Sequence, residues 1–114
     1  MSVKRIEKVA AEAVPDGVGV SKQVLISAEE APNFAMRCFT IQPGGSMPLH
    51  TNLVEHEQYV LSGSANVVIG EETYTVEPGS VVFIPAGAAH TYVNNGSEPF
   101  RFLCLVPNRE DKTS

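Results

Sequence analysis

Apolar and polar residues alternate with a period of two along much of the chain, a pattern typical of half-buried β-strands. Segments of this kind, rich in Val, Ile, Phe, Tyr and Thr, lie at residues 21–27, 35–41, 58–61, 65–69, 73–76, 81–84, 91–93 and 100–106. Gly, Pro and Asn separate them at short intervals and leave no space for a long helix. Short strands at this spacing predict an all-β fold, an antiparallel sandwich or barrel.

The N-terminal third follows this pattern less closely. Apolar residues at helical spacing leave residues 2–14 open between a helix and an extended segment. Ser27 and Glu30 have the spacing of a capping box, so a single helical turn is predicted at residues 28–33, limited by Pro32. We divide the chain into an N-terminal strand and connector segment at residues 1–33, a barrel at 34–107 and a polar tail at 108–114.

Length and composition indicate one ordinary globular domain. The chain has 114 residues, of which 43% are hydrophobic and 18% charged, enough to bury a core. Because the net charge is −5 and no basic cluster is present, we expect neither nucleic acid nor an anionic membrane as a partner. The longest nearly apolar run, residues 81–89, is broken by Pro85 and Gly87 and is too short to span a membrane.

The N-terminus and the cysteines indicate the compartment. Residues 1–8 carry charges where a secretory signal has its apolar stretch, so we expect a cytoplasmic protein. Cys38 and Cys104 lie within apolar strand segments and belong to no CxxC spacing. In a reducing compartment such cysteines are expected to be buried free thiols.

The histidines His50, His56 and His90 each stand at an end of an apolar segment beside a Gly/Pro turn. Alternation places a polar residue on the same face as each of them: Asn52 with His50, Gln58 with His56 and Tyr92 with His90. If these faces point into one barrel, the three imidazoles converge, and imidazole is the commonest protein ligand of divalent transition metals. The alternative is three separate, hydrogen-bonded histidines at strand ends.

Two sequence motifs surround these histidines. Residues 79–94 read GSVVFIPAGAAHTYVN, and residues 44–63 read GGSMPLHTNLVEHEQYVLSG. With this spacing of Gly, Pro, His and Asn, the chain resembles the cupins, in particular small single-domain cupins of the cupin 2 conserved barrel type. The resemblance covers about residues 34–107 and implies a double-stranded β-helix, or jelly-roll barrel.

The resemblance also implies a metal site. In the family, two His and a Glu of the first motif and the His of the second bind one metal ion. By position these ligands become His50, Asn52, His56 and His90, with His56 in place of the Glu. The implied cofactor is one divalent transition-metal ion, Mn, Fe, Ni, Cu or Zn. Asn52 is a weak ligand compared with imidazole, which leaves a position for water or substrate; some cupins have lost the metal altogether.

Two functions remain open on this evidence. The first is a small metal-dependent enzyme, dioxygenase-like or isomerase-like, acting on a small oxygen-bearing substrate. The second is a non-catalytic cupin that binds a small molecule or a metal as a sensor or accessory protein. Gln58 and Tyr92 are the candidate polar residues of the pocket, whereas Glu55 and Glu57 are expected to point away from it. No catalytic residue is assigned.

We predict a homodimer, because small jelly rolls have edge strands that need cover. Residues 1–33 could lie across the sheet of a partner, with Val20, Val24 and Ile26 buried at the contact. Light scattering at micromolar concentration is expected to give twice the mass of one chain. A mass near that of a single chain would contradict this prediction.

Overall fold

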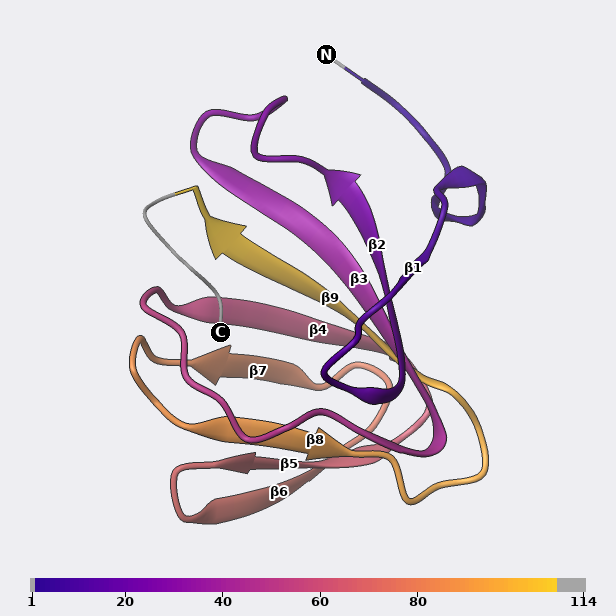
Figure 1. Cartoon of the computed structure of the whole chain (residues 1–114), viewed down its shortest axis with the longest axis vertical. Helices are drawn as coiled ribbons and strands as arrows, with labels where there is room; N and C mark the ends of the chain where they lie inside the picture. Colours follow the sequence, from indigo (N-terminus) through magenta and orange to yellow (C-terminus); the bar gives the residue numbers. More distant parts are fainter. Residues whose placement is uncertain (1, 109–114) are drawn as a thin grey trace.

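The computed structural model describes residues 2–108, and almost all of their regular structure is β-strand (Figure 1). A short 3-10 helix, η1, spans Ile6–Lys8. The strands are β1 (Glu12–Ala13), β2 (Val18–Ile26), β3 (Phe34–Ser46), β4 (His56–Ser62), β5 (Ala65–Ile69), β6 (Glu72–Val76), β7 (Val81–Ile84), β8 (His90–Val93) and β9 (Phe100–Pro107). A strand is present at each position that the alternation predicts, which confirms the all-β fold class.

The strands form one antiparallel sheet that curls on itself, consistent with the predicted jelly roll. Its order is β6-β5-β8-β3-β9-β4-β7, with β2 paired to β3 and β1 paired to β2. In Figure 1, β2, β3, β9, β4 and β7 form one wall, and β8, β5 and β6 lie below them as the other. The walls are joined through β3, which pairs with β9 along its first half and with β8 at its end.

Aromatic side chains fill the space between the walls. Every second residue of β9 is buried, which places Phe102 and Cys104 on the inner face. The Phe102 ring stacks on Tyr92 and on Phe39, with centroids 5.0 and 5.5 Å apart. The Tyr92 ring in turn lies 5.8 Å from the ring of His90. The aromatic core therefore extends directly to one of the candidate site residues.

Both cysteines are buried and neither forms a disulfide, as predicted. Arg37 of β3 is opposite Cys104 of β9, and Cys38 is opposite Leu103. Because successive side chains of a strand point to opposite faces, the two thiols lie on opposite sides of the sheet. This arrangement keeps them apart.

β3 is longer than the predicted segment, which ends at residue 41, because the strand continues to Ser46. Pro43 and Gly44 predict a turn, but Gly44 adopts a φ of 82°, which lets the strand bend without ending. The Gly44 N–H donates to the Asn94 carbonyl oxygen (2.8 Å), and the Asn94 N–H donates to that of Gly45 (3.0 Å). This long-range pairing, which local sequence does not reveal, carries the chain from one wall to the other.

The connector between β2 and β3 forms one hydrogen-bonded turn that is too short for a helix. The N–H groups of Glu30 and Ala31 both donate to the carbonyl oxygen of Ser27, at 3.2 and 3.0 Å. The Glu30 N–H also lies 3.2 Å from the Ser27 hydroxyl, which is one half of the predicted capping box. The structure therefore has the predicted single turn and half of its capping box, and this turn does not extend into a helix.

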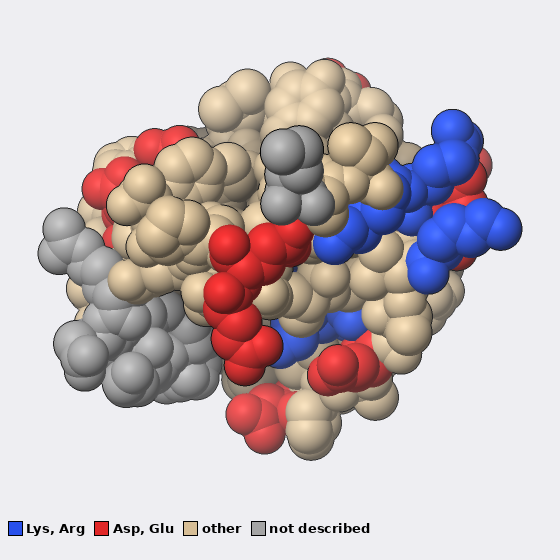
Figure 2. Space-filling model, turned by 90° about the horizontal axis from the view of Figure 1, so that it is seen from above, with Lys and Arg blue, Asp and Glu red and all other residues tan. Residues whose placement is uncertain are grey.

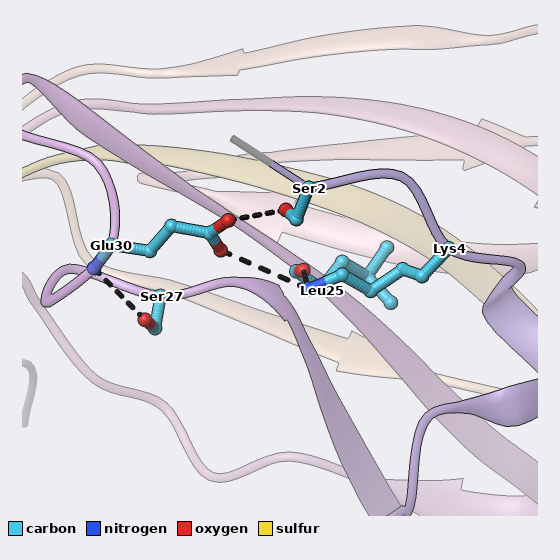
Figure 3. A network of polar contacts seen from close by, with 5 residues as sticks. All are labelled: Ser2, Lys4, Leu25, Ser27 and Glu30. Atoms are coloured by element: carbon cyan, nitrogen blue, oxygen red, sulfur yellow. Dashed lines mark hydrogen bonds and ion pairs between the residues drawn. The ribbon is translucent and has the colours of Figure 1, made fainter.

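The Glu30 side chain binds the N-terminal segment instead of completing the capping box (Figure 3). Its carboxylate accepts a hydrogen bond from Ser2 and forms a 3.8 Å ion pair with Lys4. Lys4 also donates to the Leu25 carbonyl oxygen at 2.8 Å. Residues 2–14, which the sequence leaves open, contain η1 and β1 and are held against β2 and the connector by these contacts.

The N-terminal segment packs on its own chain in this structure. β2 pairs along β3, and Val20 is buried in the core, whereas Val24 is 37% exposed. The homodimer and its exchanged segment stay predictions.

The helical segment within residues 2–108 is too short and too polar to cross a membrane. On the face seen in Figure 2, basic side chains lie beside acidic ones, with uncharged surface around them.

Asn94 is the polar residue on which the junction of the walls depends. It is fully buried, donates to the carbonyl oxygens of Ile41 (2.8 Å) and Glu98 (2.9 Å), and accepts from the Gly96 N–H (2.9 Å). Asn94→Ala leaves these groups without partners, so we expect it to lower the free energy of unfolding by about 2–4 kcal/mol. Denaturant unfolding measures this loss.

Asn66→Ala is the matched control for this prediction. The Asn66 side chain makes one exposed hydrogen bond, which it accepts from the Thr75 hydroxyl at 3.1 Å. We expect this variant to change the free energy of unfolding by no more than about 0.5 kcal/mol. Equal losses in the two variants would show that Asn94 has no special structural role.

Candidate functional site

Backbone hydrogen bonds bring the two sequence motifs together at His50 and His90. The His50 N–H donates to the His90 carbonyl oxygen at 3.0 Å, and the His90 N–H donates to that of His50 at 2.9 Å. Residues that exchange both bonds in an antiparallel pair present their side chains on the same face. The two imidazole rings accordingly lie with their centroids 4.3 Å apart.

His56 enters the site from β4. It is the first residue of that strand, is 4% exposed and lies opposite Ile84 of β7. Its ring centroid is 6.1 Å from that of His90. The structure therefore places the three histidines beside one another, although no three His, Cys, Asp or Glu side chains among residues 2–108 form a ready-made metal-binding group.

The Nδ1 atoms of His50 and His90 are held by backbone oxygens. His50 Nδ1 lies 2.8 Å from the Pro48 carbonyl oxygen, and His90 Nδ1 lies 3.0 Å from that of Ala88. Because a carbonyl oxygen only accepts hydrogen bonds, each Nδ1 carries the hydrogen, and in the neutral ring the lone pair is at Nε2. The Nε2 atom of His90 is buried and has no hydrogen-bond partner among residues 2–108.

Burial also sets the charge of His90. Loss of hydration lowers the pKa of this imidazole, and the positive charge of a protonated His50 would lower it further, against an opposing effect of the Ala88 hydrogen bond. The lowered pKa favours the neutral ring, which is the form that binds metal ions.

Asn52 is buried beside His56, although it does not lie on a strand with His50 as the alternation predicts. Residues 51–55 form an irregular loop, held by a 2.8 Å hydrogen bond from the Gly87 N–H to the Asn52 carbonyl oxygen. The Asn52 side chain is 4% exposed, and its Nδ2 lies 3.3 Å from His56 Nδ1. Its Oδ1 is buried without a hydrogen-bond partner among residues 2–108. A half-turn of this amide would place that oxygen against His56 Nδ1.

Gln58 and Tyr92, the predicted polar residues of the pocket, are buried and bonded to each other. The Gln58 Nε2 donates to the Tyr92 hydroxyl oxygen at 2.5 Å. Burial, with a smaller electrostatic contribution from Cys104, raises the pKa of Tyr92 well above its usual range, against the opposing hydrogen bond from Gln58. Tyr92 therefore stays a protonated phenol. Glu55 and Glu57 are exposed, as predicted.

The site contains a cavity of about 200 Å³. Its wall includes the three histidines, Gln58 and Tyr92. Three charged residues that the sequence analysis did not single out also line it: Asp16, Lys22 and Arg37. A signal for Arg37 was present, because on β3 it alternates with the buried apolar residues Phe39 and Ile41, where a charged side chain is unusual.

The fold and the arrangement of the motifs define a class of β-barrel protein. The family model described as Cupin domain matches residues 37–106. This match covers more than half of the chain, and the chain belongs to the cupin family.

Three relatives have names of enzymes. The polyketide cyclase RemF from Streptomyces resistomycificus has a similar structure, with a TM-score of 0.90 and 32% identity, over 99% of this chain and 84% of that one. The 1-methylthio-D-xylulose 5-phosphate methylsulfurylase of Rhodospirillum rubrum is 30% identical over 93 residues, which cover 82% of this chain and 59% of the relative. Mannose-1-phosphate guanylyltransferase RfbM of Salmonella typhimurium is 35% identical over 77 residues, which cover 66% of this chain and 16% of the relative. This chain thus spans less than two thirds of both curated relatives.

Proposed function

We propose that this cupin is a small metal-dependent enzyme that holds one divalent transition-metal ion, Mn, Fe, Ni, Cu or Zn, on His50, His56 and His90, with the fourth position left to water or substrate. The observation that carries the proposal is the Nε2 atom of His90, buried without a hydrogen-bond partner among residues 2–108. A buried polar atom without a partner costs free energy. A cation that accepts its lone pair removes this cost.

The donor chemistry of the site fits such an ion. A metal-binding histidine usually donates its other ring N–H to a carbonyl or carboxylate oxygen, which fixes the tautomer and the ring orientation. Pro48 and Ala88 supply such oxygens for His50 and His90. The Asn52 side chain is the corresponding neighbour of His56, at 3.3 Å. The proposal therefore rests on donor atoms and their partners, and the ring positions themselves are not those of a ready-made cluster.

The cavity favours a small substrate that bears oxygen. Its volume of about 200 Å³ is below the roughly 300–1,000 Å³ of pockets for drug-sized ligands. When bound, the metal ion supplies a Lewis acid that polarises a substrate oxygen. Tyr92 keeps its proton and offers a hydroxyl fixed by Gln58, so this wall can donate a hydrogen bond but supplies no phenolate base. The similarity to a polyketide cyclase favours a reaction without added oxygen, such as an isomerase-like one, over a dioxygenase-like one.

A non-catalytic binding domain is the second candidate function. The observation in its favour is that the chain matches only 16% of the guanylyltransferase, where a domain of this kind is a small part of a larger enzyme. Mass spectrometry of metal-loaded protein with small diketones and hydroxy acids separates the two. A product of unchanged mass supports the isomerase-like enzyme, and added oxygen indicates the dioxygenase-like one. Binding without any product supports the second candidate.

The proposal includes a cytoplasmic homodimer. Both cysteines are free thiols, as expected in a reducing compartment. Large apolar side chains on the outer face of β4 and β7 offer a surface for a second copy, because Tyr59, Val81 and Phe83 are 46%, 79% and 54% exposed. This exposed apolar surface is a second reason, besides the edge strands that need cover, to expect two copies of the chain to associate.

The metal site is tested with zinc and His90→Ala. We expect the wild-type chain to bind one Zn²⁺ in competition with a chromophoric chelator, and the variant to bind more than about 100-fold more weakly, since even outer-sphere changes cost roughly 10–100-fold. Zinc at 100 times its Kd is expected to raise the free energy of unfolding by about 2.7 kcal/mol, and a chelator to remove this gain. The zinc affinity should decrease as the pH is lowered, because protons compete for the imidazole lone pairs.

Glu55→Gln and Glu57→Gln are matched controls, because both carboxylates flank His56 in sequence and are exposed. Neither change is expected to alter zinc affinity. Unchanged zinc affinity in His90→Ala, or an equal loss in the glutamate variants, would contradict the proposed site.

A further inference from the structure

The cavity has a second, charged side that the cupin motifs do not include. Arg37 of β3 and Lys22 of β2 line it together with Asp16, which precedes β2. Arg37 shares the inner face of β3 with Phe39, and Lys22 is the β2 residue opposite Phe39. Both basic residues are half-buried. The two cations exceed the one carboxylate among these lining residues, in a chain whose net charge is −5.

Among residues 2–108, Arg37 has no anionic partner of the kind that a buried guanidinium normally has. Its guanidinium carbon lies 5.2 Å from the centroid of the Phe39 ring, and its Nη2 donates to Cys104 Sγ at 3.3 Å. A thiol sulfur is a weak acceptor, whereas a guanidinium has five N–H donors. The Nε atom is buried without a hydrogen-bond partner among residues 2–108, and the ion pairs found in this range, Lys4–Glu30 and Arg5–Glu7, do not involve it.

We propose that Arg37, assisted by Lys22, binds the carboxylate group of the substrate, so that the cavity takes a small organic acid. A partly buried cation without a counter-ion costs free energy, and a bound anion removes that cost. The planar fork of a guanidinium matches the two oxygens of a carboxylate. The ring of Phe39 and the Cys104 sulfur hold the guanidinium in place before the ligand arrives.

This inference rests on the proposed function, because it assigns the substrate class of the same cavity. A carboxylate on Arg37 would place the rest of a small acid between the charged side and the histidines, since both line one space of about 200 Å³. The site would then select a substrate with an acidic group at one end and a polarisable oxygen at the other.

Binding of benzoate and of its uncharged analogue benzamide, measured by isothermal titration calorimetry on the full chain, tests the proposal. We expect benzoate to bind about 10-fold or more tightly than benzamide, because hydrogen bonds to charged groups are stronger than neutral ones. Arg37→Gln is expected to remove most of this preference, because benzoate loses more affinity than benzamide. Arg37→Lys, which keeps the charge and loses the fork, should retain part of it.

Arg101→Gln is the matched control. Arg101 also contacts a thiol, with its Nη2 3.7 Å from Cys38 Sγ, but it is not among the residues that line the cavity. We expect this variant to bind benzoate like the wild type. An equal loss in Arg37→Gln and Arg101→Gln, no preference for benzoate over benzamide, or tighter binding of inorganic phosphate than of benzoate would overturn the proposal.

Each titration is run on chelator-treated and zinc-loaded protein, with the melting temperature of every variant recorded to exclude unfolded samples. Zinc affinity is expected to be unchanged in Arg37→Gln, because Arg37 is not among the proposed ligands. If the wild type binds no zinc, the proposed function is contradicted. If zinc binds but benzoate is not preferred through Arg37, only the inference is contradicted. The two failures are therefore read separately.

Discussion

The pair of backbone hydrogen bonds between His50 and His90 is the interaction on which the rest of the site depends. It continues the pairing that begins at Gly44 and Asn94, where β3 passes from one wall of the jelly roll to the other. Each such bond contributes only about 0.5–1.5 kcal/mol net, so the junction depends on several of them together and on the buried Asn94 side chain. Without this junction nothing would hold the segment of His50 against β8, and the imidazoles of His50 and His90 would not meet.

The junction also explains why one cavity combines two kinds of chemistry. The first half of β3 pairs with β9 and β2 and carries Arg37 on its inner face, whereas its end leads into the segment that holds His50 against β8. Imidazoles, the Tyr92 phenol and the two cations therefore line the same space. The motif residues belong to the family, while the charged side depends on strands outside the motifs.

Much of the fold could be predicted from local sequence, because apolar and polar residues alternate along each strand. This alternation indicates which face of the strand is buried. Residues 65–69 and 81–84 were predicted with the bounds that the structure has. The extension of β3 could not be predicted, because Pro43 and Gly44 are typical of a turn. Partners that are distant in sequence, Val18, Val93 and Asn94, keep the strand paired. The motif spacing identified the candidate histidines. The irregular loop at residues 51–55, and the burial of Arg37 Nε without a hydrogen-bond partner among residues 2–108, depend on tertiary packing.

Backbone carbonyl oxygens fix the tautomers of His50 and His90, so that each Nε2 offers a lone pair. Long-range ¹H–¹⁵N NMR of the histidine side chains in chelator-treated protein, at a pH above the ordinary histidine pKa of roughly 6.5, measures this most directly. We expect both rings to carry hydrogen on Nδ1 and none on Nε2, as their 2.8 and 3.0 Å contacts with Pro48 and Ala88 require. Hydrogen on Nε2 of either ring would contradict this expectation.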